Sequence, residues 1–314
     1  MIIGSGSSGK VYKPYPIDCK NIGFLQPKDN YVGKISNTDN LSLEQVNEIE
    51  KIRKKIDPKS KFTLPYLGCC HRCTINEDNE VWENGTYDIQ YIYSYGGERI
   101  KHTGEEISLK KLFRFAKQIS KMNQLGYSHL DIKEANVLIK EAKLFLIDFD
   151  LCIPSEEIYQ KFFTEKMFEN IYYYIWPPEI NFGLNKCGKY MKSLEKVPLE
   201  FEYMWTTGVF SESRVLKRIN RYLGSKDYHQ LLLKVKQDYA KVDIYSFGML
   251  MKFLLIKPSK EIKALIHKAI EPIPSLRIDW ETFLSEFSLI LSKLDKNNHS
   301  VDVASNVPPS CDNK

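Results

Sequence analysis

The feature that most constrains this chain is a pair of polar clusters separated by an apolar run. The first cluster lies in HLDIKEANVLI (129–139), where Asp131, Lys133 and Asn136 interrupt a mainly apolar segment. The second cluster is IDFD, whose Asp148 follows Asn136 by twelve residues and ends the apolar run LFLI. Such a short run predicts a short buried strand. Either cluster alone could be a chance pattern on a surface loop, so the motifs elsewhere in the chain must decide.

The chain opens with MIIGSGSSGKVYKP, a glycine- and serine-rich stretch that could be a flexible linker, a P-loop or a phosphate-binding lid. A P-loop needs Ser or Thr after its lysine to hold magnesium, but Val11 follows Lys10. The same residues also fit Gly4-x-Gly6-x-x-Gly9-x-Val11, a lid whose backbone N–H groups close over phosphates. Linkers of this composition are common at chain ends, so the stretch by itself leaves linker and lid open.

HLDIKEANVLI resembles the catalytic loop of eukaryotic-type protein kinases, His-Arg-Asp-x-Lys-x-x-Asn, and IDFD stands where that family keeps Asp-Phe-Gly. Other segments resemble further kinase motifs and follow in the family's order. They are the opening lid, YVGKIS (31–36), WPPE (176–179), DIYSFGMLM (243–251) and PSLRI (274–278). The resemblance implies an α+β, bilobal protein-kinase fold with a small β-rich N-lobe and a larger, mainly helical C-lobe.

The same resemblance implies how the chain is divided. The N-lobe should span 1–95 and the C-lobe 96–294, with an insert at about 182–235 that is longer than the family's usual spacing. The last stretch, 295–314, has little to bury and is expected to be a disordered tail. Hydrophobic periodicity predicts strands at 30–36, 87–95 and within 144–153, and helices at 42–56, 108–126, 243–255, 259–270 and 279–294.

The resemblance assigns the chemistry of phosphoryl transfer residue by residue. Asp131 should orient the substrate hydroxyl and accept its proton, and Lys133 should neutralise charge on the moving phosphoryl group. Asn136 and Asp148 should hold Mg²⁺, for which Mn²⁺ can substitute. Asp-x-Lys is the serine/threonine form of the loop, so we expect ATP-dependent transfer to Ser or Thr of protein substrates.

Nucleotide binding is expected to centre on Lys34 of YVGKIS, which should grip the α- and β-phosphates and pair with a helix glutamate. Glu44, Glu48 and Glu50 compete for that place, and the distance to Asp57 favours Glu48. The remaining nucleotide contacts are expected from the lid and from apolar residues around the adenine: Ile3, Gly4, Gly6, Gly9, Val11, Val32 and Leu138.

Two further residues should support this site from outside it. Asp243 should brace the catalytic loop, and Arg277 should be the buried ion-pair partner of Glu179. The chain also departs from the family at several places, two of which lie in the catalytic motifs. Leu130 replaces the arginine that receives an activation-segment phosphate, so we expect no such switch. Asp150 replaces the glycine of Asp-Phe-Gly, a position where Asp is better tolerated than most residues.

The alternative interpretation is a catalytically weak or dead pseudokinase that acts as a binding module. Retention of Lys34, Asp131, Asn136 and Asp148 together argues against it, because a scaffold has no need of all four. The composition, rich in Lys, Ile, Tyr and Asn, and the altered Asp-Phe-Gly resemble protein kinases of large nucleocytoplasmic DNA viruses. That narrower resemblance implies a host-cytoplasm or virion location.

Composition and charge limit the partners and locations that we expect for this chain. The net charge is only +5 and the lysines are scattered, so we expect no nucleic-acid partner. We find no apolar run of the roughly 18 residues that span a bilayer, so we expect no membrane span.

The seven cysteines are consistent with reduced thiols in the cytoplasm. CCHRC (69–73) offers one Cys-x2-Cys pair, Cys70 and Cys73, plus His71, whereas a structural zinc site usually has two such pairs, so the segment should be a turn between strands. The sequence makes no prediction about oligomeric state.

Overall fold

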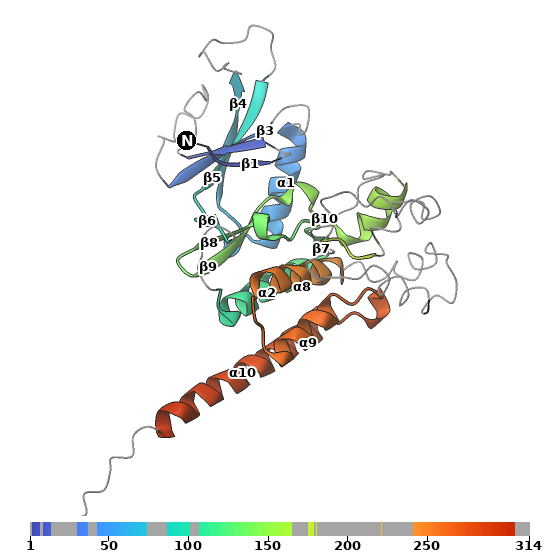
Figure 1. Ribbon diagram of the computed structural model, residues 1–314. Helices are drawn as coiled ribbons and strands as arrows, with labels where there is room; N and C mark the ends of the chain where they lie inside the picture. The colour runs from blue at the N-terminus through green and yellow to red at the C-terminus, as the bar shows by residue number, and fades with distance from the viewer. Residues whose placement is uncertain are drawn as a thin grey trace, which may run out of the picture. The chain divides into compact units, whose positions relative to one another are not determined.

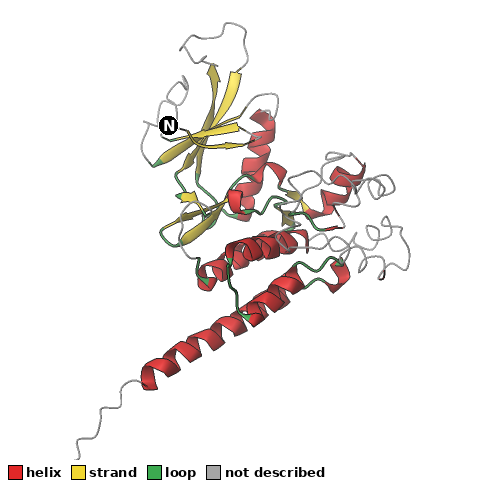
Figure 2. Ribbon diagram, in the orientation of Figure 1, coloured by secondary structure: helices red, strands yellow, loops and turns green. Residues whose placement is uncertain are grey.

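The computed structural model describes most of the two ends of the chain and parts of its middle. The described residues are 2–6, 9–13, 30–36, 43–73, 87–100, 107–164, 175–178, 180, 221 and 241–304. Within them the chain is mixed α/β, with a β-sheet region in the N-terminal part and helices in the C-terminal part (Figure 2). The predicted insert at 182–235, apart from Arg221, lies outside the described residues.

The chain forms two compact units, each of which contains two stretches of sequence. One unit consists of Met1–Glu105 and Glu134–Cys152, and the other of Glu106–Lys133 and Ile153–Lys314. The segment Glu134–Cys152 thus belongs to the same compact unit as the N-terminal sheet, and the lobe boundary at 95/96 stays a prediction.

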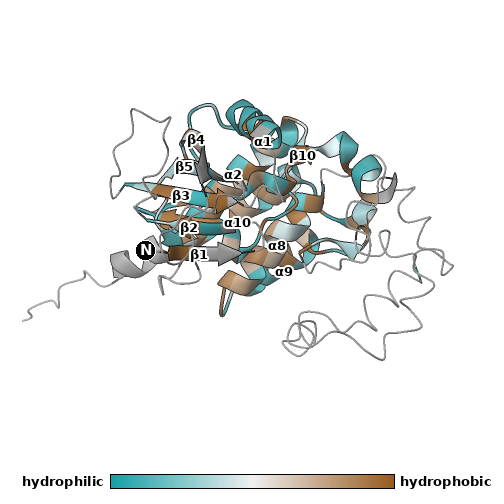
Figure 3. Ribbon diagram, turned by 90° about the horizontal axis from the view of Figure 1, so that it is seen from above, coloured by the Kyte–Doolittle hydropathy of each residue, from teal (hydrophilic) through white to brown (hydrophobic). Residues whose placement is uncertain are grey.

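The first unit is built on a five-stranded antiparallel sheet (Figure 1). Its spatial order is β1 (Ile2–Gly6), β2 (Gly9–Tyr12), β3 (Tyr31–Ser36), β5 (Tyr87–Ser94) and β4 (Tyr66–Cys73). β-branched and aromatic residues dominate β3 and β5, as expected for the interior of a sheet. In β3 the apolar Val32 and Ile35 are buried on either side of Lys34, and Figure 3 shows the corresponding mixture of brown and teal along this strand.

The glycine-rich opening is part of this sheet. Strands β1 and β2 pair antiparallel, with Gly4 opposite Val11 and Gly6 opposite Gly9. A P-loop leads from its glycines into a helix, whereas here Gly9–Tyr12 is a strand. The CCHRC segment also differs from expectation, because it belongs to β4 and pairs with β5 rather than forming a turn.

Helix α1 (Leu43–Ile56) lies beside the sheet and packs against it through one face. Val46 of this face joins a buried cluster with Tyr91 of β5. The same face carries Glu50 and Arg53, which are buried and joined to each other by an ion pair. The helix therefore points one glutamate inward and exposes Glu44 and Glu48.

A second, three-stranded sheet belongs to the first unit. It consists of β6 (Glu98–Arg99), β8 (Val137–Lys140) and β9 (Lys143–Leu146), in that order. The short 3₁₀ helix η1 (Glu134–Asn136) precedes β8, and η2 (Phe149–Leu151) follows β9. The backbone of Leu146 donates to the carbonyl of Phe62 at 2.7 Å and so ties this sheet to the loop after α1.

The second unit is mainly helical among its described residues. Its helices are α2 (Leu109–Gln124), α8 (Val242–Leu254), α9 (Lys260–Ala269) and α10 (Trp280–Ala304). Smaller elements are the strand pair β7 (Tyr127–Ser128) and β10 (Ile153–Pro154), the 3₁₀ turns η3 (Ser155–Glu157) and η6 (Pro274–Leu276), and the π turn η4 (Gln160–Thr164).

The sequence patterns explain how these helices begin and pack. Ser108 caps α2, and its hydroxyl accepts the backbone N–H of Lys111. Helix α8 is buried on nearly all sides from Val242 to Met251, as its almost continuous apolar sequence predicts. Aromatic rings fill the space between α8 and α10, where Phe247 contacts Trp280 and Phe283 edge-on or tilted.

The prediction for the C-terminal segment was wrong in part. Helix α10 continues to Ala304, well past the expected end near 294, so 295–304 is helical rather than disordered. Residues 305–314 lie outside the described part of the chain. Of the helices described here, none has both the length and the apolar character needed to cross a bilayer.

Candidate functional site

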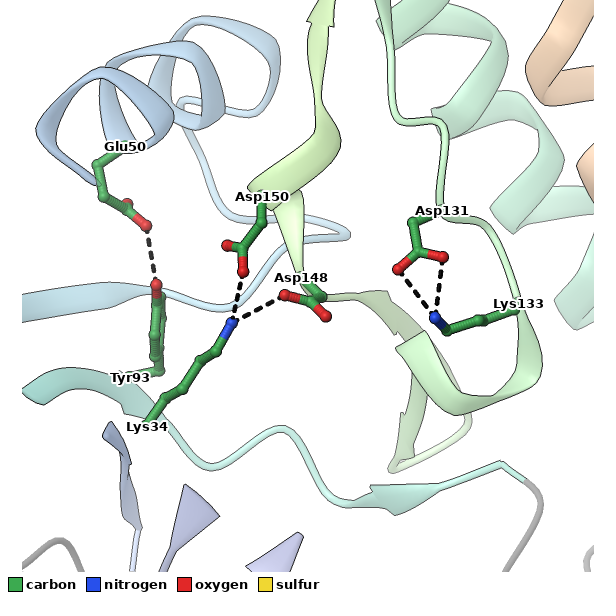
Figure 4. Close-up of polar contacts among 7 residues, drawn as sticks. All are labelled: Lys34, Glu50, Tyr93, Asp131, Lys133, Asp148 and Asp150. Carbon is green, nitrogen blue, oxygen red and sulfur yellow. Dashed lines mark hydrogen bonds and ion pairs between the residues drawn. The ribbon is translucent and has the colours of Figure 1, made fainter. Parts of the chain in front are cut away.

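The centre of the candidate site in the first unit is the ammonium group of Lys34. Strand β3 is flanked by β2 and β5, so the backbone of Lys34 lies opposite Val11 on one side and Tyr91 on the other. Its Nζ donates to Asp148 Oδ1 at 2.8 Å and to Asp150 Oδ2 at 2.9 Å (Figure 4). The side chain of Lys34 is 17% exposed. The structure thus brings together two predicted residues that lie 114 positions apart.

The electrostatics of this cluster follow from its partial burial. Burial alone would lower the pKa of Lys34, but the charges of Asp148 and Asp150 outweigh it and raise the pKa above its usual value. Burial, together with the charge of the nearby Asp148, raises the pKa of Asp150 to about 6, although the attraction of Lys34 opposes this rise. Two carboxylates and one ammonium leave the cluster with one net negative charge when all three are ionised.

The two predicted metal ligands also lie together. Asn136 immediately precedes β8 and Asp148 closely follows β9, so the β8–β9 hairpin returns the chain to where it started. The backbone N–H of Ile147 donates to the Asn136 carbonyl at 3.0 Å, which fixes this end of the hairpin. Asn136 is 5% exposed. Carboxylate and amide oxygens are hard donors of the kind that Mg²⁺ prefers, so this pair fits the predicted ion chemically.

Asp148 adopts a left-handed backbone conformation, with φ of 65°. Non-glycine residues pay a conformational cost there, although Asp tolerates it better than most. The conformation opens η2 directly after Asp148, and two residues later the Asp150 carboxylate reaches the same ammonium. Among the described residues we find no cluster of three or more His, Cys, Asp or Glu side chains that could hold a metal by themselves.

The prediction that Glu48 is the partner of Lys34 is not what the structure shows. Glu48 is exposed and forms an ion pair with Lys51 one turn later, at 2.6 Å. The buried glutamate of this helix is Glu50, whose Oε2 accepts from Arg53 Nε at 2.6 Å. Its Oε1 accepts from the Tyr93 hydroxyl at 3.1 Å (Figure 4). The physical reason is helix phase, because Glu50 shares a face with Val46 and Arg53, and Glu48 does not.

Glu50 is part of a buried polar network that supports α1. Burial raises the pKa of Glu50, and the attraction of Arg53 opposes this rise. Arg53 also donates to the Thr63 hydroxyl and the Leu64 carbonyl. Asp57, at the end of the helix, accepts the backbone N–H groups of three residues that follow it, Lys61, Phe62 and Thr63.

The residues predicted to surround the nucleotide all lie on strands of the first unit. Gly4, Gly6 and Gly9 belong to the β1–β2 hairpin. The apolar members differ in burial. Ile3 is exposed on β1, Val11 is half-buried on β2, Val32 is buried on β3, and Leu138 is half-buried on β8. Their contact with an adenine stays a prediction.

The second unit holds the first part of the predicted catalytic loop, with Asp131 and Lys133. Asp131 is 6% exposed, and Lys133 Nζ lies 3.0 Å from its carboxylate (Figure 4). The backbone N–H of Asp131 donates to His129 Nδ1 at 3.2 Å, which places the hydrogen of a neutral imidazole on Nε2. A carboxylate and an ammonium therefore stand side by side on one short loop, next to a buried histidine.

Asp243 braces this loop, as predicted. Its carboxylate, fully buried at the start of α8, accepts the backbone N–H groups of His129 at 2.8 Å and Leu130 at 3.0 Å. It also accepts from Asn123 Nδ2 at 2.7 Å. Burial raises the pKa of Asp243, and these three hydrogen bonds oppose the rise. The expected partner of Arg277, Glu179, lies outside the described residues; Arg277 itself is buried and donates to the carbonyls of Glu271 and Lys241.

Sequence reasoning missed three supporting residues. Asn123 joins α2 to Asp243 and also accepts from Trp280 Nε1. Trp176 donates its indole N–H to the Leu130 carbonyl at 2.7 Å. Asp150 was noted only as a departure from a motif. The signal for Asn123 was a large polar residue on the mainly apolar face of an amphipathic helix, whereas only tertiary contacts reveal the other two.

Comparison with known proteins adds no assignment. No protein-family model matches this chain, and no curated protein is significantly similar to it.

Proposed function

We propose that the chain is a protein kinase with the bilobal kinase fold, which transfers the γ-phosphoryl group of Mg-ATP to Ser or Thr side chains of protein substrates. The observation that carries the proposal is the ion pair between Lys34 and Asp148, at 2.8 Å. These residues come from two motifs that the sequence identified separately. In a nucleotide site of this class, an ammonium and a metal-binding carboxylate must meet around the same phosphates.

The first unit would bind the nucleotide. Lys34 would contact the α- and β-phosphates, and the glycine-rich β1–β2 hairpin would offer backbone N–H groups to the phosphate chain. Asn136 and Asp148 would hold Mg²⁺. When bound, the ion supplies positive charge that neutralises the phosphate oxygens.

The catalytic loop of the second unit would act on the acceptor. Asp131 would orient the Ser or Thr hydroxyl and accept its proton as the oxygen–phosphorus bond forms and the bond to ADP breaks. Lys133, 3.0 Å from Asp131, would neutralise charge on the phosphoryl group in transit. Asp243, which accepts a backbone N–H of the loop, and Trp176, which donates to a loop carbonyl, support this role because they hold the loop backbone in one conformation.

A second candidate function, a pseudokinase that binds partners without transferring phosphate, is favoured by one observation. Both Asp148 and Asp150 engage Lys34, and the resulting net negative charge repels a nucleotide in the absence of a cation. If both ion pairs persist when nucleotide is present, the Lys34 ammonium cannot contact the phosphates. The two candidates therefore differ in whether Mg-ATP can compete for Lys34.

The proposal is tested with radiolabelled ATP, Mg²⁺ and a generic basic protein substrate. Wild type should transfer label to Ser or Thr residues, which acid hydrolysis of the labelled substrate identifies. Asp131→Asn should transfer label at least about 100-fold more slowly. Asp295→Asn is a matched control, because Asp295 is a half-exposed carboxylate that forms an ion pair with Lys110 at the surface. Wild type that neither binds Mg-ATP in a thermal-shift assay nor transfers label would favour the binding module.

A further inference from the structure

Asp150 stands where the kinase family places a glycine, and its side chain is engaged. Its Oδ2 lies 2.9 Å from Lys34 Nζ, nearly the same distance as Asp148 Oδ1 at 2.8 Å. Its side chain is 25% exposed, similar to that of Asp148 at 26%. Figure 4 shows the two carboxylates converging on one ammonium. Lys34 thus has a second anionic partner besides the predicted metal ligand.

The glutamates of α1 are either exposed, as Glu44 and Glu48 are, or engaged with other side chains, as Glu50 is. Both oxygens of Glu50 accept hydrogen bonds, one from Arg53 and one from Tyr93. Withdrawing Glu50 toward Lys34 would leave the charge of Arg53 buried without its counter-ion, because the Arg53 side chain is only 6% exposed. Glu48 lies on an exposed face and pairs with Lys51. The helix therefore supplies no counter-ion to Lys34.

Asp150 is placed to serve as the counter-ion that α1 does not supply to Lys34. The turn η2, which carries Asp150, contacts α1, so its carboxylate approaches Lys34 from the region next to the helix. Asp148 is needed as a ligand if a cation binds, and a carboxylate that coordinates a cation attracts an ammonium less strongly. Asp150 would then remain as the anion that keeps Lys34 extended toward the phosphates.

We propose that Asp150, rather than a glutamate of α1, is the residue that positions Lys34 for nucleotide binding. This inference rests on the proposed function, since it concerns the same site. It predicts that Asp150 acts through Lys34 and not independently on the nucleotide. A residue that merely blocked Lys34 would have the opposite effect, because its removal would free the ammonium and reduce the negative charge of the cluster.

The test is a double-mutant cycle on the full chain, read out as the affinity for Mg-ATP by calorimetry. The variants are Asp150→Asn, Lys34→Met and the double variant. We expect Asp150→Asn to weaken Mg-ATP binding by at least about tenfold. In the Lys34→Met background the same change should weaken it by less than about twofold, because the group through which Asp150 acts is gone.

Two further variants keep the result interpretable. Asp150→Glu retains the charge and should recover a substantial part of the affinity, which a purely structural role of Asp150 would not predict. It also serves if Asp150→Asn fails to fold, as judged by thermal unfolding without nucleotide. Glu141→Gln is the matched control, since Glu141 is an exposed carboxylate in the turn between β8 and β9, and it should bind Mg-ATP like wild type.

Each outcome of these measurements supports or overturns a stated claim. Wild type that does not bind Mg-ATP would overturn the proposed function and this inference with it. Wild type that binds, together with equal or tighter binding by Asp150→Asn, would overturn the inference alone. If Asp150→Asn weakened Mg-ATP binding equally with Lys34 present and in the Lys34→Met variant, Asp150 would act independently of Lys34. If Glu48→Gln or Glu50→Gln weakened Mg-ATP binding more than Asp150→Asn does, a glutamate of α1 would be the residue that positions Lys34.

Discussion

Asp243 accepts the backbone N–H of Leu130 at 3.0 Å, although 113 positions separate the two residues. Leu130 has a left-handed backbone with φ of 62°, which is costly for a leucine. The Leu130 carbonyl is held as well, by the indole of Trp176. The loop that carries Asp131 is therefore kept in an unfavourable conformation by buried hydrogen bonds from two other segments.

The first prediction concerns this brace. Asp243→Ala should destabilise the protein by about 3 kcal/mol or more, because it leaves two buried backbone N–H groups and the Asn123 amide without their acceptor. Denaturant unfolding followed by tryptophan fluorescence measures the effect. Asp295→Asn, on the surface, should change stability by less than about 0.5 kcal/mol. A loss in Asp243→Ala no larger than that of the control would contradict the role of Asp243.

The second prediction concerns Leu130. Its side chain is fully buried and apolar, so it offers no cation to a phosphate on the activation segment. Phosphatase treatment of the recombinant protein should therefore change its phosphotransfer rate by less than about twofold. A large loss of activity after treatment, absent when the phosphatase is inhibited, would show that a phosphate-dependent switch exists.

The third prediction concerns the charge around Lys34. With one ammonium and two carboxylates, the cluster should repel the polyphosphate of ATP until a divalent cation adds positive charge. Removal of Mg²⁺ with EDTA should weaken ATP binding by at least about tenfold, measured by calorimetry. Mn²⁺ should restore it. The prediction fails if ATP binds equally well with and without the cation.

The fourth prediction concerns the pH dependence of Glu50. Because burial raises its pKa above the ordinary 4.5, the folded state binds the proton more tightly than the unfolded state. The stabilising contribution of Glu50 is then fully present below that value and is lost as the pH rises through its folded pKa. Glu50→Gln cannot titrate, so the stability of wild type relative to this variant should decrease as the pH rises above about 4.5.

Urea unfolding at constant ionic strength measures this difference across the pH range. Tyr93→Phe provides a matched comparison, because it removes the hydroxyl that donates to Glu50 and lowers its pKa. The decrease with pH should be steeper in that background. A difference that instead grows with pH would mean that the Arg53 ion pair outweighs burial.

The fifth prediction concerns Gly97, between β5 and β6. Its φ is 91°, and a Cβ there would overlap the backbone carbonyl oxygen of Ile139. Gly97→Ala should cost roughly 2–5 kcal/mol from strain and overlap together. Gly126→Ala is the comparison, since Gly126 also has a positive φ but nothing lies within 4 Å of an added Cβ. It should cost roughly 1 kcal/mol in thermal or denaturant unfolding, from backbone strain alone. Equal costs would contradict the overlap.

Much of the fold followed from local patterns. The helices that begin near Leu43, Leu109 and Val242 were predicted within a residue or two, because apolar periodicity and a Ser cap are local signals. Strand β3 was predicted for the same reason. The end of α10 was not, because its last residues lack the apolar pattern by which burial is recognised in sequence.

The sequence by itself determined the chemistry of the candidate site, since the types and spacing of Asp131, Lys133, Asn136 and Asp148 are local properties of two short segments. Only the tertiary structure decided which carboxylates meet Lys34. Glu48 and Glu50 are two residues apart, a turn of roughly 200° around the helix, and which of them faces inward depends on how α1 packs on the sheet. Asp150 reaches Lys34 for a similar reason, because the bend at Asp148 and the strand at Lys34 come together only when distant segments fold against each other.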